Sequence, residues 1–165
     1  MRIARPLLIQ TVRFRFGTNS TKWLCKISVQ DKRAEGPFTT TFYNEHHPSD
    51  DPTCKSRPIW RVQPNSCIVT PAPNVKLLGE HVAVEGWAWS DDGVKDVSIS
   101  TDDGKNWTTA NFERRTDFSW QRFRAELSLP LGHQTILARA TSLDGRMQPL
   151  GEGRNHVHRV PIEVV

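Results

Sequence analysis

A series of short segments that alternate apolar and polar residues most constrains the fold of this chain. Because successive side chains of a strand point to opposite faces, this alternation predicts half-buried β-strands. The expected strands cover residues 82–89, 94–101, 107–112, 120–129, 134–141 and 157–164. The expected inward side chains are those of Val97, Ile99, Phe123, Ala125, Leu127 and Leu129. The expected solvent-facing side chains are those of Asp96, Ser98, Ser100, Arg122, Arg124, Glu126 and Ser128.

Aspartate–glycine turns separate these segments. Asp91-Asp92-Gly93, Asp102-Asp103-Gly104 and Asp144-Gly145 supply an aspartate that caps its own turn and a glycine that accepts a positive φ. No segment of ten or more residues shows a helical stripe. The spacing predicts an all-β chain folded as an immunoglobulin-like antiparallel β-sandwich, with a small barrel as the alternative topology.

The first part of the chain carries a different pattern. Residues 1–20 are expected to form a short N-terminal extension or a remnant of an upstream domain, and residues 21–165 a single domain. One face of an expected strand is shared by Trp23, Cys25, Ile27 and Val29, so that Cys25 points into the core. Residues 44–54 read as a solvated loop, and the adjacent His46 and His47 there point to opposite sides rather than to one metal ion.

Composition limits the partner and the compartment. The 22 Lys and Arg residues are scattered among 18 Asp and Glu residues, so the net charge of +4 indicates a solvated surface. Three cysteines without a CxxC spacing predict neither a zinc site nor a disulfide framework, which favours a reducing compartment, cytoplasmic or mitochondrial. The first 30 residues lack acids, as a mitochondrial presequence does, but a short Arg-decorated strand at residues 12–16 is the favoured explanation. No apolar run is long enough to span a membrane.

Several motifs in a fixed order resemble the C-terminal dimerisation domain of the sulfite oxidase and nitrate reductase family of molybdopterin oxidoreductases. The similarity covers roughly residues 20–165. It rests on Lys22-Trp23-Leu24, Pro64-Asn65-Ser66-Cys67-Ile68 with Pro71, Gly86-Trp87-Ala88-Trp89-Ser90, Ser100 to Gly104 with Trp107, Trp120, Arg139-Ala140, Gln148-Pro149 and Asn155 to Val160.

The resemblance implies a role rather than a reaction. In such enzymes an upstream domain holds the molybdenum-pyranopterin cofactor through a cysteine thiolate and transfers oxygen atoms, while this domain packs two subunits together. We therefore expect a non-catalytic dimerisation domain without the cofactor-binding catalytic domain, because there is no room for that fold before Lys22. No residue is assigned a catalytic, cofactor-binding or metal-binding role, and the chain alone is expected to be inactive and to bind no cofactor.

Two departures from the family pattern support that expectation. Family members commonly carry an arginine in the stretch Gly-x-Arg-x-x-Lys-Trp, which helps to bind the anionic substrate, and the matching residue here is Asn19. The segment after Gln148-Pro149 is also shorter than in the family.

The expected partner is a second copy of the chain or a full-length relative. Exposed aromatic area marks association surfaces, and the candidates are Trp87, Trp89, Trp107 and Trp120. Packing in the core explains these tryptophans equally well.

The alternative function is a stand-alone immunoglobulin-like module that binds a ligand or a polyanion through Arg114, Arg115, Arg122 and Arg124. Nucleic acid is not an expected ligand, because basic and aromatic residues do not interleave. His156 and His158 share a face, and a hydrogen-bonding or interface role is favoured over metal binding.

Overall fold

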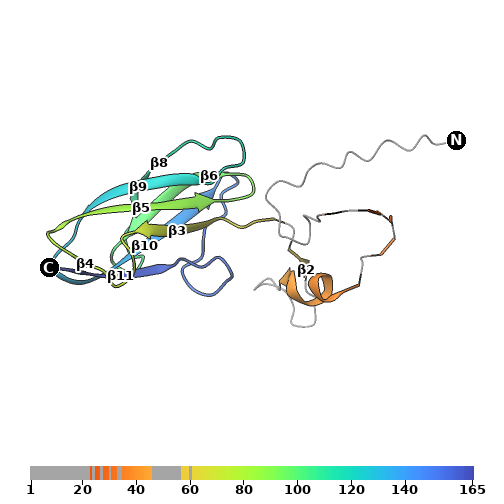
Figure 1. The fold of residues 1–165 in the computed structure, drawn as a ribbon, viewed down its shortest axis with the longest axis horizontal. Coiled ribbons are helices and arrows are strands. Elements are labelled where there is room, and N and C mark those ends of the chain that lie inside the picture. Colours follow the sequence, from red (N-terminus) through yellow and green to blue (C-terminus); the bar gives the residue numbers. More distant parts are fainter. Residues whose placement is uncertain are drawn as a thin grey trace. The chain divides into compact units, whose positions relative to one another are not determined.

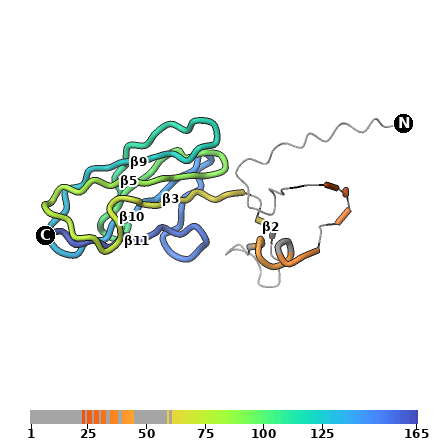
Figure 2. Tube along the Cα trace, in the orientation of Figure 1, coloured from red at the N-terminus to blue at the C-terminus, as the bar shows by residue number. Residues whose placement is uncertain are grey.

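The chain divides into two compact units, residues 1–62 and residues 63–165. The computed structural model describes residues 23, 25, 26, 28, 29, 31, 32, 35–45, 57–59 and 61–165 (Figures 1 and 2). Among these residues, no helix has the length and apolar character needed to cross a membrane.

The first unit contains little regular structure where it is described. A single π-helical turn, η2 (Phe38–Phe42), precedes β1 (Asn44–Glu45), which pairs antiparallel with β2 (Arg57–Pro58). The amide of Ile59 donates to the carbonyl of Tyr43 at 3.0 Å and extends this small ladder. The loop predicted for residues 44–54 therefore begins with a strand, because Asn44 and Glu45 find pairing partners distant in sequence; His46 and His47 lie outside the described residues.

The strand predicted around Trp23 is wrong at the described positions. Trp23 has a φ of 52° in a bend and its side chain is exposed, and Cys25, predicted to point into the core, is exposed as well. A left-handed φ is incompatible with an extended strand. Alternation specifies which face of a strand would be buried, but it does not supply the neighbouring strand or the sheet against which that face packs.

The second unit is a sandwich of two sheets, as predicted (Figure 1). The four-stranded sheet has the order β3-β5-β9-β8 and the five-stranded sheet the order β4-β11-β10-β6-β7. All pairs are antiparallel except β4 with β11, which are parallel. The strands are β3 (Asn65–Thr70), β4 (Lys76–Leu77), β5 (His81–Trp89), β6 (Val94–Ser100), β7 (Thr108–Thr109), β8 (Asn111–Phe112), β9 (Gln121–Ser128), β10 (Gly132–Ser142) and β11 (Arg159–Val164). The all-β sandwich is confirmed, and its immunoglobulin-like topology stays a prediction.

The strand predicted at residues 107–112 passes from one sheet to the other. β7 pairs with β6 in the five-stranded sheet, whereas β8 pairs with β9 in the four-stranded sheet. Buried Ala110 stands between them, and its amide still donates to the carbonyl of Val97 at 2.8 Å. A pattern of alternating side chains cannot reveal this change, because the alternation continues while the pairing partner is exchanged.

The core lies between the two sheets and follows the predicted alternation. Val97, Ile99, Phe123 and Leu129 are buried, and Ala125 and Leu127 pack against the same cluster. Ser100 is the exception, since it was expected to face solvent and is buried. Its hydroxyl accepts a hydrogen bond from the amide of Gly104 at 2.9 Å and donates to Asp102 at 2.8 Å, so the turn that follows the strand covers it.

The two ends of the sandwich differ in which chain segments reach them. β3 starts opposite Trp89, so the chain enters the second unit at this end, which we call the tryptophan end. At the other end, the amide of Gly79 donates to the carbonyl of Val165 at 2.9 Å, and the amide of Leu129 donates to Glu80 at 2.8 Å. We call this the leucine end, and the C-terminus lies there (Figure 1).

Candidate functional site

Three of the motifs that carry the family resemblance meet at one buried glutamine. The Oε1 of Gln148 accepts hydrogen bonds from the hydroxyl of Ser66 at 2.8 Å and from the amide of Ala140 at 3.1 Å. Its Nε2 donates to Asn65 Oδ1 at 2.8 Å and to the carbonyl of His156 at 3.3 Å. Ser66 lies on the four-stranded sheet and Ala140 on the five-stranded sheet, so Gln148 cross-links the two layers.

The same network holds the start of the second unit. The side-chain amide of Asn155 donates to the carbonyl of Pro64 at 2.8 Å. The hydroxyl oxygen of Ser66 also lies 2.7 Å from the carbonyl of Ala138, so its single proton is shared between that carbonyl and Gln148 Oε1. These polar atoms are engaged with one another inside the protein. The signature residues of this region therefore act as structural cross-links.

The second signature, Gly86-Trp87-Ala88-Trp89, lies in the centre of the four-stranded sheet. Trp89 stacks on Trp120 with ring centroids 4.5 Å apart and an interplanar angle of 18°. Trp87 and Trp120 are 37% and 50% exposed, whereas Trp89 is half-buried. Of the tryptophans proposed for association, Trp87 and Trp120 thus present aromatic surface on this unit.

Trp107 packs onto the turn that precedes it. Its Nε1 donates to the carbonyl of Gly104 at 2.9 Å, and the guanidinium of Arg139 lies 4.0 Å above its ring. Asp102 ties the same turn by accepting bonds from the amide of Asn106 at 2.9 Å and from its side chain at 2.6 Å. Led by the backbone bond from Asn106, these donors lower the pKa of Asp102 to about 2.

A single arginine gathers three acidic side chains at the tryptophan end. Arg146 binds Asp144 at 2.9 Å and Asp91 at 2.7 Å, and it reaches Asp92 at 3.4 Å. It also donates to the side chain of Gln63 at 3.0 Å. The hydrogen bond from Arg146, more than any other contact, holds the pKa of the Asp144 carboxyl well below its usual range. This cluster joins two turns to the segment that leads into β3.

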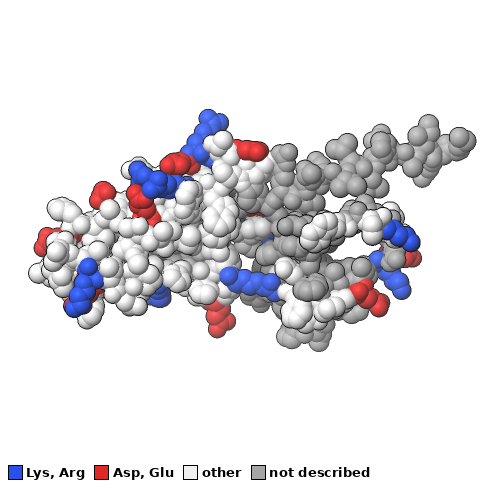
Figure 3. Space-filling model, in the orientation of Figure 1, with Lys and Arg blue, Asp and Glu red and all other residues white. Residues whose placement is uncertain are grey.

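Two of the four arginines proposed to bind a polyanion are paired with an acidic residue. Arg122 forms an ion pair with Glu85, and Arg124 pairs with the same carboxylate at 3.1 Å. Arg115 lies over the ring of Phe118 at 5.4 Å from its centroid, and Arg114 is exposed. On the face shown in Figure 3, Lys and Arg side chains lie among Asp and Glu side chains. The ion pairs of Arg122 and Arg124 with Glu85 argue against a polyanion site on β9. Arg114 and Arg115 line the cavity of about 520 Å³ together with Lys95.

Two histidines of the last segment border an open cavity of about 680 Å³. His156 and His158 are both exposed, and the Nδ1 of His156 lies 2.8 Å from the carbonyl of Gly153. That contact agrees with the hydrogen-bonding role expected for His156. Both residues precede β11, which begins at Arg159 rather than at residue 157 as predicted.

The described residues do not fit a molybdenum-pyranopterin cofactor. Such a group needs a thiolate that points into a cavity lined by polar donors. Cys25 is exposed and Cys67 is half-buried, and neither lines the cavities of about 320, 520 and 680 Å³. Within the described part of the chain, no group of three His, Cys, Asp or Glu residues is arranged to hold a metal ion. Asn19, which stands where the family has its substrate arginine, lies outside the described residues.

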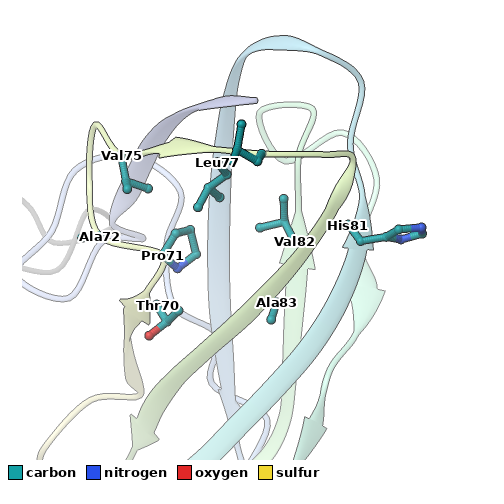
Figure 4. A pocket seen from close by; sticks show the side chains of 9 residues that line it. Thr70, Pro71, Ala72, Val75, Leu77, His81, Val82 and Ala83 are labelled. Carbon is teal, nitrogen blue, oxygen red and sulfur yellow. The ribbon is translucent and has the colours of Figure 1, made fainter. Parts of the chain in front are cut away.

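The sequence interpretation missed an apolar surface at the leucine end. Leu78 and Leu131 are 89% and 64% exposed, and Val165 is 45% exposed. A cavity of about 320 Å³ lies beside Leu78 and is lined mainly by apolar residues (Figure 4). Leu78-Gly79 and Leu131-Gly132 place leucines next to glycines, but this pattern does not distinguish an exposed leucine from a buried one.

Comparisons with known proteins agree with a structural role for the signature residues. A family model described as the Mo-co oxidoreductase dimerisation domain matches residues 56–163. The mitochondrial sulfite oxidase of Drosophila melanogaster is 26% identical over an alignment of 178 positions, which spans 90% of this chain and 31% of the relative. The mouse and human mitochondrial sulfite oxidases are 25% and 24% identical, over 90% and 81% of this chain. The chain thus spans less than a third of the length of these relatives.

A solved structure shows the same fold. The sulfane dehydrogenase SoxCD from Paracoccus pantotrophus superposes with a TM-score of 0.74 at 23% identity, over 92% of this chain and 42% of that chain. The two sheets, which the signature residues cross-link, define a β-sandwich domain. The chain belongs to the Mo-co oxidoreductase dimerisation domain family, whose model covers well over half of it.

Proposed function

We propose that this chain joins two copies of itself, or one copy and a full-length relative, as the non-catalytic dimerisation domain of a sulfite-oxidase-like molybdenum oxidoreductase. The observation that carries the proposal is the match of residues 56–163 to the dimerisation domain. The internal use of the signature polar groups supports it, because Asn65, Ser66 and Gln148 bond one another instead of lining a reaction site.

Sedimentation velocity of the purified 165-residue chain tests the proposal. We expect a reversible monomer–dimer equilibrium that changes little between low and high salt, because apolar contacts are not screened by ions. A strictly monomeric species at every concentration and at both salt levels would contradict it.

We also propose a reducing compartment, either cytoplasmic or mitochondrial. Cys25 and Cys67 are free thiols, and the sulfite oxidases to which the chain is similar are named as mitochondrial. Fluorescence microscopy of the tagged chain, with mitochondrial and secretory markers, tests this proposal. A secretory location would contradict it.

A further inference from the structure

Three basic residues line one cavity at the tryptophan end of the sandwich. Lys95 is the second residue of β6, and Arg114 and Arg115 lie in the loop between β8 and β9 (Figure 1). All three line the cavity of about 520 Å³. None of the described residues that line it is acidic. A concave site lined by charges of one sign concentrates ions of the opposite sign, so this lining favours an anion.

The acidic neighbours of these residues in the sequence do not share the cavity. Asp96 and Glu113 follow Lys95 and precede Arg114, but neither of them lines it. Asp96 instead accepts a hydrogen bond from the hydroxyl of Ser98 at 2.7 Å. Within the described part of the chain, neither Lys95 nor Arg114 forms an ion pair. Their charges are therefore available to a ligand.

The turns beside the cavity also direct their acids elsewhere. Asp92 precedes Gly93 and Asp144 follows Leu143, and both Gly93 and Leu143 line the cavity. The carboxylates of Asp92 and Asp144 lie 3.4 and 2.9 Å from the guanidinium of Arg146. Neither carboxylate belongs to the cavity wall.

A buried glutamine fixes the two segments that carry the basic residues. The Oε1 of Gln121 accepts a hydrogen bond from the amide of Val94 at 2.8 Å. Its Nε2 donates to the carbonyls of Glu113 at 3.2 Å and Val94 at 3.3 Å. Gln121 is only 3% exposed, and it joins the residue before Lys95 to the residue before Arg114. Because these protein groups already hold the two segments together, a ligand does not have to order them.

The rest of the wall includes apolar side chains, among them those of Phe112 and Leu143. Cavities that bind small organic molecules usually measure about 300–1,000 Å³ and combine apolar walls with a few charged or polar groups that orient the ligand. The cavity of about 520 Å³ has both features. An inorganic oxyanion would use the charges and leave the apolar wall in contact with water.

We propose that this cavity binds a small organic anion. Its carboxylate, sulfonate or phosphate group contacts Lys95, Arg114 and Arg115, and its apolar body packs against Phe112 and Leu143. This binding site goes beyond the proposed dimerisation function and does not depend on it.

Isothermal titration calorimetry of the 165-residue chain with naphthalene-1-sulfonate tests the proposal, since this probe joins an aromatic body to one sulfonate. We expect one site per chain, with binding at least threefold weaker at about 0.15 M salt than at about 0.01 M, because ions screen exposed charges. Sulfate carries charge without an apolar body, and 1-naphthol carries the body without charge at neutral pH. Both should bind at least tenfold more weakly than naphthalene-1-sulfonate.

Substitutions locate the bound probe. Lys95→Gln and Arg114→Gln each remove one exposed charge from the cavity, and each should raise the dissociation constant at least threefold. Lys105→Gln is the matched control, because Lys105 is exposed in the turn that follows the opposite end of β6 and its loss changes the net charge equally. It should leave the dissociation constant within 1.5-fold of the wild type. All three side chains are exposed, so the variants should keep the thermal midpoint of the wild type.

Three results would overturn the proposal. The first is the absence of saturable binding of naphthalene-1-sulfonate, by calorimetry and by the fluorescence of the probe. The second is equal affinity of the wild type and the two cavity variants, which means that the probe binds elsewhere. The third is sulfate that binds as tightly as naphthalene-1-sulfonate, which means that the apolar wall contributes nothing. The oligomeric state is measured separately by sedimentation, so a failure here leaves the dimerisation proposal standing.

Discussion

Gly86 occupies a position in the four-stranded sheet that leaves no room for a side chain. A Cβ atom there would lie 2.1 Å from the carbonyl oxygen of Cys67 and 2.4 Å from the ring of Phe123. One of these contacts is backbone and the other is a fully buried ring, so neither can yield without moving β3 or the core. The glycine of the signature is thus required by packing.

Gly86→Ala should lower the free energy of unfolding by at least about 3 kcal/mol, at the upper end of overpacking costs. Gly151→Ala is the control, since a Cβ there meets nothing within 4 Å, and it should change the stability by less than about 0.5 kcal/mol. Urea denaturation of both variants measures the difference. Equal stabilities would show that β3 and β5 can separate without cost.

The sequence motif singled out Gln148 but did not show that this residue links the two sheets. We expect Gln148→Leu to lower the free energy of unfolding by roughly 2–4 kcal/mol, because it leaves the buried amide of Ala140 without its acceptor and removes one of the two donors to Asn65 Oδ1. Gln134→Leu, which removes a single exposed bond to the carbonyl of Pro130, should cost less than about 0.5 kcal/mol. Thermal unfolding of the two variants makes the comparison, and similar midpoints would argue against the cross-link.

At the scale of single elements, the turn at Asp102 makes the stability of the protein depend on pH. Its folded pKa of about 2 lies below the value near 3.9 of an unfolded aspartate. A depressed pKa means that the folded state favours the carboxylate, so the stabilisation is present above about pH 4 and is lost as the pH falls through about 2. The thermal midpoint of the wild type should therefore fall across this window.

The Asp102→Asn variant isolates this turn from the other acids. It should begin with a lower midpoint at neutral pH and lose less of it between pH 4 and pH 2 than the wild type does. Differential scanning calorimetry at several pH values in this range provides the measurement. A variant whose midpoint falls as steeply as that of the wild type would mean that Asp102 does not contribute to the acid response.

The elements also differ in how far the sequence could predict them. The hairpins of the sandwich were predictable because the turn residues and the apolar period agree locally, as at Gly104 and in β9. The strand that was wrongly predicted around Trp23 was supported by the alternation of apolar and polar residues alone. The division of residues 107–112 between two sheets and the cross-links of Gln148 depend on contacts between segments distant in sequence, which no local pattern contains.

The exposed leucines illustrate the same limit for the candidate site. Tryptophan content drew attention to aromatic residues, and Trp87 and Trp120 are exposed in part. Leu78 and Leu131 read as ordinary apolar residues in the sequence, because exposure depends on which loops meet at the end of the sandwich. The three-dimensional arrangement was needed to bring them together with Val165.

For the whole molecule, we expect neither bound molybdenum nor sulfite oxidation. We predict that the 165-residue chain, purified from a host that makes the molybdenum cofactor, contains no stoichiometric molybdenum and does not oxidise sulfite, because the described cysteines do not fit such a cofactor. A full-length sulfite oxidase prepared in the same host is the positive control. One molybdenum per chain in elemental analysis would contradict the prediction.

The passage of the chain from one sheet to the other at Ala110 has a consequence for the dynamics of the sandwich. The amide of Ala110 is held by Val97 in the five-stranded sheet, while the next two residues pair with β9 in the four-stranded sheet. Neither sheet can open without straining the segment that belongs to both. In native-state hydrogen exchange, the central amides of β9 and β10 should therefore open with the same free energy, as one cooperative unit.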